Sequence, residues 1–351
     1  MYKSLAVGGH GIGSHYGTFV IAEAGVNHNG DVAMAKELVL AAKRAGADCV
    51  KFQTFKASRV VTASAPKAKY QTLVTDPAES QIDMLRKLEL DENAYGDLIQ
   101  LCKAEGLVFT STPYNEEDIA FLDALDVPVL KAASIHLAEP RFLKRMAQTG
   151  RPLIVSTGMA TWDELTQAVQ TIRSTGNEKF ILLQCTTNYP SAVIDTNLKC
   201  MVAMRDRFEC LVGYSDHTQS HIPCLGAVAL GACMIEKHFT LDKFLPGPDH
   251  STSETPDSLA ALVRAVRTME EALGTSNKSP TEAERANMEG MRRSIVARRH
   301  IAAGQVIGDD DLTSKRPATG ISPSNWGQVV GMTATRTIPS GAMLEWDDLN
   351  D

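Results

Sequence analysis

A regular alternation of short apolar runs with longer amphipathic segments is the feature that most constrains this chain. The apolar runs have about the length of buried parallel strands, and the eight of them begin at residues 18, 48, 107, 129, 152, 179, 211 and 234. Helical patterns lie between the runs, and Thr161 with Glu164 forms a capping-box sequence at the start of one of them. Eight strand–helix units predict an α/β fold, a (β/α)₈ TIM barrel that spans residues 1–273.

A doubly wound open sheet is the alternative that the same alternation allows. Such sheets commonly carry a Gly-x-Gly-x-x-Gly turn between a strand and a helix, and no such turn follows a predicted strand here. The glycines between residues 8 and 13 precede the first predicted strand, so we expect a loop there. The closed barrel is therefore the favoured fold.

The character of the sequence changes after the predicted barrel. Residues 274–290 contain little apolar material and are predicted to be a linker. Residues 291–351 hold short β-prone runs broken by Gly, Pro and Asp, which predicts a small β-rich domain. Two similar units recur inside it, at residues 300–312 and 337–349, and indicate an internal repeat.

Composition excludes several classes of protein. A net charge of −7 disfavours nucleic acid or an anionic membrane surface as the main partner. No run approaches the roughly 18 apolar residues of a membrane span, and the first residues lack the apolar core of a secretory signal. Seven scattered cysteines form no Cys-x-x-Cys pair, which is typical of reduced thiols in a cytoplasmic protein.

Polar side chains follow almost every predicted strand. In a barrel the carboxyl ends of the strands meet at one end, where functional residues collect. One polar residue in such a place is commonly structural, whereas a full ring indicates a polar pocket. The ring consists of Glu23, Lys51, Gln53, Thr110, Thr112, Lys131, Ser134, Ser156, Thr157, Gln184, Thr186, Thr187, Tyr189, Ser215, Asp216, His217, Glu236, Lys237 and His238.

Two lysines give this ring its first chemical function. Lys51 and Lys131, with the hydroxyl groups of Thr112, Ser134 and Ser156, suit an anionic phosphate or carboxylate. A surface charge is the structural alternative for either lysine alone. A Schiff-base lysine, as in class I aldolases, is the competing chemical role.

Two histidines give the ring its second function. His217 and His238 lie about one strand–helix unit apart, which places them at equivalent positions on adjacent strands. Two imidazoles there are able to hold a divalent metal, and the lack of a Cys ligand favours Mn²⁺ or Mg²⁺ over structural Zn²⁺. Glu23, near His28, is a candidate general base or hydroxyl binder, and Asp249 on a Pro/Gly-rich loop is a candidate ligand of a sugar hydroxyl.

The same residues sit in strings that resemble the bacterial sialic acid synthase family, which includes N-acetylneuraminate, legionaminate, pseudaminate and spore-coat polysaccharide synthases. The resemblance covers nearly the whole chain. It is carried by IAEAGVNHNG, ADCVKFQTF, PKAKYQ, ESQIDMLRKLEL, STPYNEEDIAFL, VSTGMAT, CTTNYPS, GYSDHT, IEKHFTLDK and GPDHS. The segments RRSIVARRHI, KRPATGISP and TIPSGAML are similar to the family's C-terminal antifreeze-like (SAF) domain.

This resemblance implies a transferase that uses phosphoenolpyruvate. Carbon C3 of phosphoenolpyruvate attacks the aldehyde of an open-chain N-acyl hexosamine such as N-acetylmannosamine, water adds at C2, and phosphate leaves by C–O cleavage. The implied metal ligands are His217 and His238. The implied phosphoenolpyruvate contacts are Lys51, Thr112, Lys131, Ser134, Ser156 and Ser215, and the implied sugar contacts are Glu23, Gln53, Tyr189 and Asp249.

The resemblance also implies a subunit assembly, and the chain departs from the family's sequence pattern at two places. The antifreeze-like domain's arginine, here Arg316, reaches the acyl-sugar pocket of a partner subunit in this family, which implies a domain-swapped homodimer. After Ser134 the family commonly has Gly-Glu, whose glutamate contacts the sugar, and this chain has Ile135 and His136. Thr187 stands where N-acetylneuraminate synthases often have Asn. We expect His136 and Thr187 to contact the acceptor sugar.

Two other functions remain as alternatives. One is a metal-dependent or Schiff-base aldolase or lyase on the same barrel, which cleaves a sugar acid and releases no phosphate. The other is a non-catalytic protein whose C-terminal domain binds glycan or ice. The complete set of Glu23, Lys51, Lys131, His217 and His238 argues against the second alternative.

Overall fold

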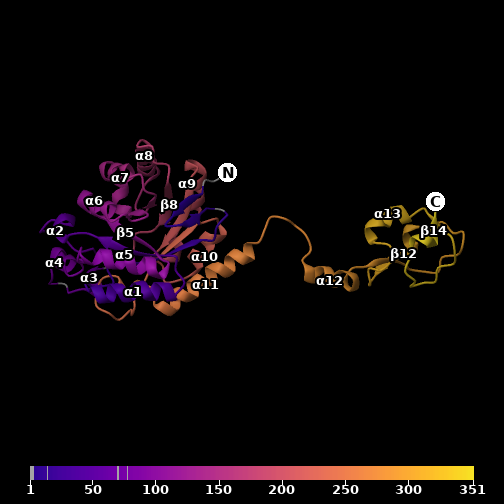
Figure 1. The fold of residues 1–351 in the computed structure, drawn as a ribbon. Coiled ribbons are helices and arrows are strands. Elements are labelled where there is room, and N and C mark those ends of the chain that lie inside the picture. Colours follow the sequence, from indigo (N-terminus) through magenta and orange to yellow (C-terminus); the bar gives the residue numbers. More distant parts are fainter. Residues whose placement is uncertain (1–3, 14, 69–70, 77) are drawn as a thin grey trace. The chain divides into compact units, whose positions relative to one another are not determined.

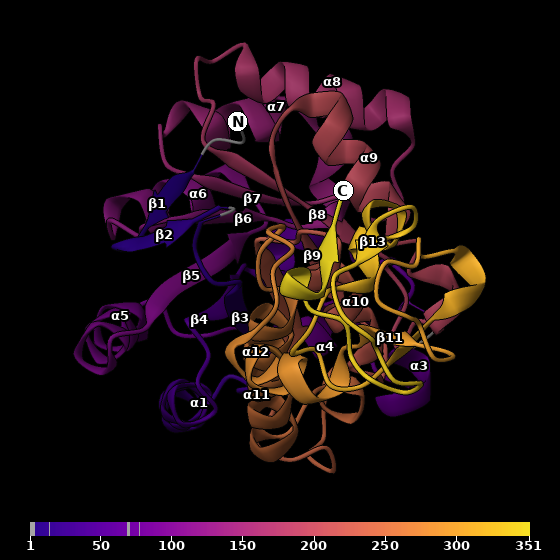
Figure 2. The same cartoon turned by 90° about the vertical axis from the view of Figure 1, so that its right-hand side faces the viewer.

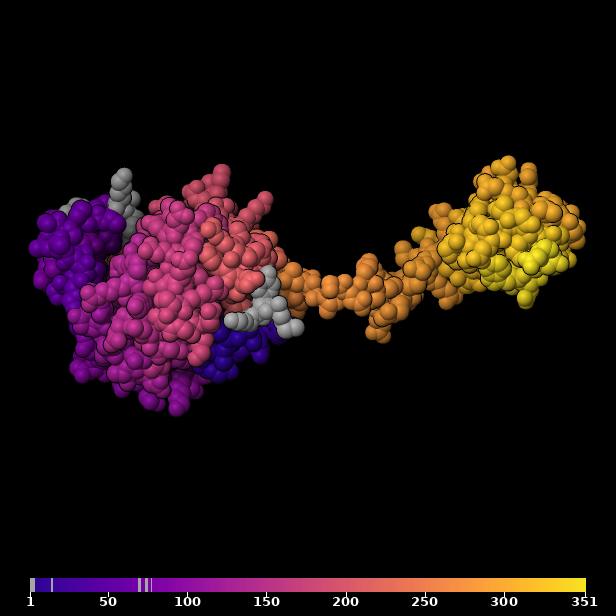
Figure 3. Space-filling view, turned by 90° about the horizontal axis from the view of Figure 1, so that it is seen from above, coloured from indigo at the N-terminus to yellow at the C-terminus, as the bar shows by residue number. Residues whose placement is uncertain are grey.

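The structure is a computed structural model that describes residues 4–13, 15–68, 71–76 and 78–351. Lys69 and Tyr70, inside the family-like string PKAKYQ, lie outside the described residues. The chain divides into two compact units, Met1–Gly274 and Thr275–Asp351. Figure 1 draws the fold as a ribbon, and Figure 3 shows the close-packed surface of each unit, the second mainly in yellow.

The first unit contains the predicted barrel. Its strands are all parallel and close in the order β10, β3, β4, β5, β6, β7, β8, β9. They span β3 (Phe19–Gly25), β4 (Cys49–Thr54), β5 (Val108–Pro113), β6 (Leu130–Ala132), β7 (Leu153–Ser156), β8 (Phe180–Cys185), β9 (Leu211–Asp216) and β10 (Met234–His238). Each strand falls on one of the eight apolar runs, which confirms the (β/α)₈ prediction.

Helices cover the outside of the barrel because their apolar stripes pack on the outward-facing strand residues. In the ribbon α1 lies beside α5 and α11 (Figure 1). The predicted capping box is present, since Thr161 and Glu164 bond each other's backbone N–H groups. The helices are α1 (Val32–Arg44), α5 (Ala94–Glu105), α6 (Glu116–Ala124), α7 (Pro140–Gln148), α8 (Trp162–Arg173), α9 (Lys199–Phe208), α10 (Ile222–Ala229) and α11 (Pro256–Leu273).

An apolar layer fills the barrel towards the amino ends of its strands. Ile21, Ile154, Ile181 and Met234 belong to it, and all are at most 1% exposed. The layer continues into a hairpin of β1 (Leu5–Val7) and β2 (His10–Ile12), which is drawn beside the barrel strands in Figure 2. The hairpin corrects our expectation of a loop around residues 8–13.

The sequence contains a turn pattern that predicts this hairpin. Gly8 and Gly9 form its two-residue turn and both have positive φ angles, of 55° and 88°. A Gly-Gly pair between β-prone residues favours a turn of this kind.

A long excursion between β4 and α5 covers one side of the barrel mouth. It contains the short helices α2 (Ala57–Val60), α3 (Gln71–Val74) and α4 (Gln81–Arg86). Phe55 and Leu88 form a small apolar cluster with Val26. This cluster attaches the excursion to the loop that follows β3.

The second unit is small and has little regular structure. β11 (Ser294–Ala297) pairs with β12 (Leu312–Lys315), and β13 (Thr333–Ala334) pairs with β14 (Leu349–Asn350). Helix α12 (Glu282–Met291) occupies much of the segment predicted as a linker, and α13 (Trp326–Val329) follows later. Among the described residues, the 3₁₀ helices of the first unit are η1 (Ser134–Ala138), η2 (Val193–Asp195) and η3 (His250–Thr252), and those of the second unit are η4 (Asp309–Asp311), η5 (Pro323–Asn325) and η6 (Trp346–Asp348).

The predicted internal repeat is visible in this unit. Ile301 and Ile338 occupy equivalent positions of the two sequence units and form a β-bridge with each other. Each repeat contains a 3₁₀ turn near its end, and the last aspartate of this turn bonds the arginine that directly precedes the repeat. The pairs are Arg299–Asp311 and Arg336–Asp348, each with an N–O distance of 2.5 Å.

Among the described residues, we find no helix that combines the length and the apolar character needed to cross a bilayer.

Candidate active site

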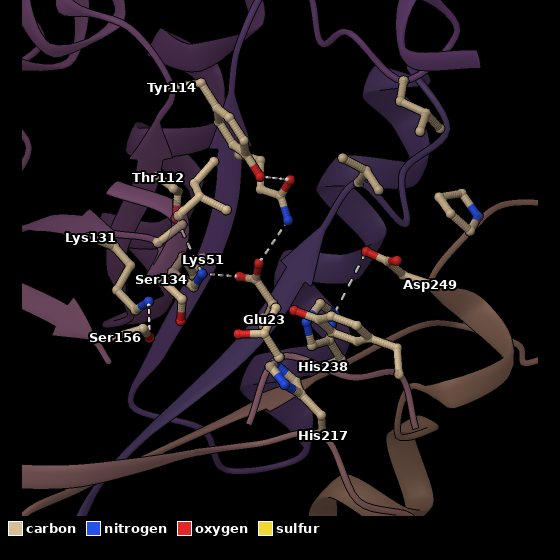
Figure 4. Close-up of a pocket in the computed structure, with 18 of the residues that line it drawn as sticks. Glu23, Lys51, Thr112, Tyr114, Lys131, Ser134, Ser156, His217, His238 and Asp249 are labelled. Carbon is tan, nitrogen blue, oxygen red and sulfur yellow. Dashed lines mark hydrogen bonds and ion pairs between the residues drawn. The ribbon is translucent and has the colours of Figure 1, made fainter. Parts of the chain in front are cut away.

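A cavity of about 330 Å³ lies at the carboxyl ends of the barrel strands. Most of the site residues predicted from the sequence line it, and the close-up in Figure 4 labels nine of them together with Tyr114. The predicted residues in the lining are Glu23, Lys51, Gln53, Thr112, Lys131, Ser134, Ser156, Thr187, Tyr189, Ser215, His217, His238 and Asp249. Parallel strands in a closed barrel bring these residues together although they span more than 220 positions of the sequence.

Two predicted residues are not in this lining. Arg316 belongs to the second unit, directly after β12. His136 is buried, and its ring stacks on Phe142 with a centroid distance of 4.0 Å. Its neighbour Ile135 lines the cavity and is 46% exposed. The structure therefore does not bring the His136 ring to the cavity that holds the other predicted residues.

Substitution of His136 tests this placement. We expect His136→Glu to lower thermal stability, because a carboxyl group buried against Phe142 without a partner costs about 1–3 kcal/mol. In the reaction that the sequence resemblance implies, Ile135→Glu, on the cavity side, is expected to change the relative kcat/KM among acceptor sugars. A melting curve and an acceptor panel on both variants check this. If His136→Glu changes the order of kcat/KM among the acceptor sugars and leaves Tm unchanged, the side chain at position 136 contacts the sugar directly.

Glu23, Lys51 and Gln53 form the centre of the cavity. Lys51 Nζ lies 3.0 Å from Glu23 Oε2 and 3.3 Å from the Thr112 hydroxyl. The Gln53 amide donates to Glu23 Oε1 at 3.2 Å and accepts from the Tyr114 hydroxyl at 3.0 Å. The side chains from β3, β4 and β5 thus hold one another in fixed orientations.

A glycine and a strand irregularity aim Glu23 into the cavity. The pairing of β3 with β4 shifts register between Glu23 and Gly25, which is a bulge at the end of β3. Gly25 has a φ of 55°, and a Cβ there would lie 3.2 Å from Glu23 Oε1. Glycine therefore suits this position both for its backbone conformation and for the space it leaves.

Lys131 and Glu236 form a second charged pair. Lys131 Nζ donates to the Ser156 hydroxyl at 2.6 Å and lies 3.6 Å from Glu236 Oε1. Glu236 also lies 3.6 Å from Lys51 Nζ and accepts a hydrogen bond from Ser215 at 2.9 Å. Glu236 therefore links the two lysines, and it was part of the predicted ring but not of the predicted site.

Burial and charge shift the acidity of these groups. Burial, with repulsion from Glu236, raises the pKa of Glu23 to about 7 against the attraction of Lys51. Burial alone would lower the pKa of Lys51, but attraction to Glu23 and Glu236 raises it above its usual value. Burial lowers the pKa of Lys131, and Glu236 offsets this only in part. Glu23 is thus able to exchange a proton near neutral pH, as a general acid or base must.

His217 and His238 lie on the other side of Glu23 from the lysines (Figure 4). Their ring centroids are 5.3 Å apart, and Tyr189 packs on His217 at 4.1 Å. His217 Nδ1 lies 2.7 Å from the Thr186 carbonyl, so it carries the proton and leaves Nε2 with a free lone pair. His238 Nδ1 is buried without a hydrogen-bond partner among the described residues and lies 3.9 Å from Asp249 Oδ2.

These two rings match a metal site only in part. Two imidazoles with available nitrogens are suitable ligands for a divalent metal. The described residues contain no cluster of three or more His, Cys, Asp or Glu side chains arranged for a metal. The remaining ligands of a bound metal would therefore be water or substrate oxygens.

Sequence reasoning missed one wall of the cavity. Side chains from the β4–α5 excursion and nearby loops face the charged half, and most are apolar. They are Val26, Val60, Val61, Gln71, Gln81, Met84, Leu85 and Leu88, with Tyr114 from the end of β5. The excursion consists of short helices, and its sequence signals were two family-like strings, PKAKYQ with Gln71 and ESQIDMLRKLEL with Gln81 and Leu88.

The fold and the cavity define a class of protein: a (β/α)₈-barrel enzyme whose site combines buried lysines, carboxylates and a histidine pair at the carboxyl ends of the strands. The sequence matches the NeuB family over residues 38–278 and the SAF domain over residues 292–350. The chain belongs to the NeuB family and carries a C-terminal SAF domain.

Known relatives agree with this assignment. The chain is 42% identical to N,N'-diacetyllegionaminic acid synthase of Legionella pneumophila, and the alignment covers 96% of each chain. It is also 42% identical to the synthase of the same name in Campylobacter jejuni, over 93% of this chain and 98% of that one. Among solved structures it resembles N-acetylneuraminic acid synthetase from Leptospira borgpetersenii in complex with citrate. That match has a TM-score of 0.74 and 30% identity, and covers 82% of this chain and 96% of that one.

Proposed function

We propose that this enzyme condenses phosphoenolpyruvate with an N-acyl hexosamine to give a nine-carbon 2-keto sugar acid and phosphate. The observation that carries the proposal is the joint presence of two buried lysines and a histidine pair in one cavity of a NeuB-family barrel. The lysines suit an anionic donor, and the histidines suit activation of a carbonyl acceptor. Relatives named as synthases of legionaminic and neuraminic acids support the same reaction class.

The donor binds at the lysine side in this proposal. Lys51 and Lys131 supply positive charge, and the hydroxyl groups of Thr112, Ser134 and Ser156 lie around them and are available as donors. Because both lysine residues are at most 4% exposed, the attraction of their ammonium groups for a phosphate is weakly screened by water. Ser215 is held by Glu236 at the same side.

The histidine side fits a divalent metal, Mn²⁺ or Mg²⁺. His217 Nε2 is free to act as a ligand, and His238 Nδ1 is a buried nitrogen without a partner in the described part of the chain. These two side chains would hold the metal, which would polarise the aldehyde oxygen of the acceptor as a Lewis acid.

The reaction forms a C–C bond and a C2–O bond to water, and it breaks the C2–O bond to phosphate. The electron pair of the phosphoenolpyruvate double bond forms the bond from C3 to the aldehyde carbon, and the aldehyde oxygen takes the C=O π electrons and a proton. Water adds at C2 and loses a proton. Phosphate then leaves with the electrons of its C2–O bond, and the remaining C2 hydroxyl loses its proton to the phosphate as the ketone forms. Glu23, held between Lys51 and Gln53, is in position to accept the proton of the water or to bind an acceptor hydroxyl. Asp249 and Tyr189 line the acceptor side.

The acceptor is an N-acyl hexosamine, and a diacetamido sugar is the first candidate. The two relatives with 42% identity are named for a product with two N-acetyl groups. The apolar wall of Val60, Met84 and Leu85 offers contact for acetyl methyl groups.

Phosphate release is the direct test of the proposal. Purified enzyme receives phosphoenolpyruvate with N-acetylmannosamine, 2,4-diacetamido hexoses or mannose in the presence of Mn²⁺, and inorganic phosphate is followed. We expect release that depends on an N-acyl acceptor. Cleavage of a sugar acid without phosphate release would favour the aldolase alternative instead.

One observation favours the Schiff-base alternative. Burial lowers the pKa of Lys131, and a lysine that attacks a carbonyl must lose its proton. Its close contacts with Ser156 and Glu236 instead suit a charged, anion-binding role. Borohydride reduction in the presence of pyruvate separates the two, because only a Schiff base leaves pyruvate covalently attached to Lys131.

We propose a homodimer in which the SAF domain of one subunit covers the barrel mouth of the other. Large apolar side chains are exposed in the segments that follow the strands, around the mouth. Met159 follows β7, Ile194 follows β8, Ile222 follows β9 and Phe244 follows β10, with exposures between 65% and 95%. A partner surface would bury these side chains. A location in the cytoplasm is proposed as well, and the unpaired state of the seven cysteines supports it.

Subunit mixing tests whether Arg316 acts in the partner's site. Lys131→Ala and Arg316→Ala are each expected to leave a homodimer with only a small fraction of the parent activity. In a mixed dimer one site combines an intact barrel with an intact arginine from the partner, so activity should return towards half of the parent value per mixed dimer. Mass spectrometry confirms the mixed species, and phosphate release measures activity. Verified mixed dimers without activity would mean that Arg316 does not serve the partner's site.

A further inference from the structure

A buried ion pair lies directly beside the two cavity histidines, and the proposed reaction does not use it. Asp216 and Lys237 are 1% and 2% exposed, and Lys237 Nζ lies 2.7 Å from Asp216 Oδ2. The two residues are paired across the parallel strands β9 and β10. Asp216 immediately precedes His217, and Lys237 immediately precedes His238.

The pair faces away from the cavity. Successive side chains of a strand point to opposite faces, and Glu236 and His238 line the cavity whereas Lys237 does not. On the outer side, Cys224 of helix α10 lies 3.2 Å from Asp216 Oδ2 through its sulfur atom. Asp216 and Lys237 therefore sit between the barrel wall and α10, out of reach of a substrate in the cavity.

The pair also ties down the chain after each histidine. Asp216 Oδ1 accepts from the backbone N–H of Thr218 and from the Tyr214 hydroxyl, each at 2.9 Å. Lys237 Nζ donates to the Thr218 carbonyl and lies 3.7 Å from Glu254 Oε1. The backbone N–H of Glu254 donates to the His238 carbonyl at 2.8 Å. One ammonium group thus connects the segments that follow both histidines.

Stability alone does not account for such a pair. Two charges must leave water to form it, and well-packed apolar side chains of similar volume often stabilise a core at least as well. An ion pair additionally constrains geometry, because each charged group must remain within bonding distance of its partners. Across β9 and β10 this fixes the strand register one residue before the two histidines.

We propose that Asp216 and Lys237 are positioning residues that set the separation of the His217 and His238 rings and thereby the affinity of this site for a divalent metal. The inference rests on the metal role proposed above. It assigns neither residue a contact with substrate.

The test measures binding of Mn²⁺ alone by titration calorimetry, with no substrate present. The double variant Asp216→Asn, Lys237→Met removes both charges but keeps an acceptor for Tyr214 and Thr218. We expect it to fold and to bind Mn²⁺ about 10–100-fold more weakly, the usual effect of losing a partner that orients metal ligands. Its kcat at saturating Mn²⁺ should stay close to the parent value, whereas the Mn²⁺ concentration for half-maximal activity should rise.

Two further variants make the outcome decisive. Arg267→Met breaks an ion pair with Asp48 at the amino ends of the strands, where the N–O distance is 2.9 Å, and should leave Mn²⁺ affinity unchanged. Tyr214→Phe removes one hydrogen bond to Asp216 with little change in volume and should weaken Mn²⁺ binding, so a double variant that fails to fold still leaves a test.

The possible results separate this inference from the proposed function. If the parent enzyme binds Mn²⁺ and the folded variants bind it equally well, the positioning role is overturned and the metal role stands. If the parent enzyme binds neither Mn²⁺ nor Mg²⁺, the metal role and the positioning role fail together.

Discussion

Replacement of either cavity histidine by alanine is expected to abolish condensation and leave the fold intact. His217 and His238 are the two imidazoles available to a metal, and a single remaining ring is a weak anchor. Loss of the metal removes several kcal/mol of charge stabilisation in the transition state, which corresponds to a rate decrease of about 10³-fold or more. Phosphate release in the presence of Mn²⁺ measures the loss, and circular dichroism verifies the fold.

A chelator provides the complementary measurement. Excess EDTA should abolish the activity of the parent enzyme, and Mn²⁺ or Mg²⁺ added in excess of the chelator should restore that activity. For the two histidine variants, His10→Ala is the matched control and should keep the parent activity. His10 lies in the N-terminal hairpin and not in the lining of the catalytic cavity. Full activity in excess chelator would remove the metal from the mechanism.

Truncation of either buried lysine is expected to impair the use of phosphoenolpyruvate. Lys51→Ala and Lys131→Ala each delete a charge-assisted contact worth ~1.5–3 kcal/mol, so kcat/KM for phosphoenolpyruvate should fall roughly 10- to 150-fold. The KM for the acceptor should change less. Lys36→Ala, which removes an exposed pair with Asp97, is the control and should have little effect.

The two lysine variants should also differ in stability. Lys51 contacts both Glu23 and Glu236, whereas Lys131 contacts Glu236 alone among carboxylates of the described residues. Lys51→Ala therefore leaves more buried negative charge without a partner and should lower Tm more than Lys131→Ala. Unchanged phosphoenolpyruvate kinetics in both variants would contradict the donor site at the lysines.

The barrel and the charged half of the cavity were predictable because they depend on short-range patterns. A buried strand such as β8 (Phe180–Cys185) shows its length and apolar character directly in the sequence. Once eight such strands close into a barrel, their carboxyl ends converge, so the positions of Lys51, Lys131 and His238 in the sequence are enough to predict that they lie together.

The remaining parts of the cavity depend on tertiary features that short-range sequence patterns do not determine. Strand β6 ends at Ala132, and residues 134–138 turn into a 3₁₀ helix, so strand alternation no longer indicates which of Ile135 and His136 faces the cavity. The wall around Met84 comes from short helices whose position is set by the Phe55–Leu88 cluster, a tertiary contact. The role of Glu236 depends on its distances to two lysines, which the sequence does not contain.

The apolar layer at the amino ends of the strands has a kinetic consequence. Ile21, Ile154 and Met234 close that end, so both substrates and both products pass through the mouth at the other. The donor lysines are at most 4% exposed, whereas Ile135 at the cavity is 46% exposed, so the donor occupies the deeper position in our proposal. A sugar that arrives first then obstructs the way to Lys131. Steady-state turnover should accordingly follow a compulsory order, with phosphoenolpyruvate as the leading reactant and inhibition by high concentrations of the acceptor.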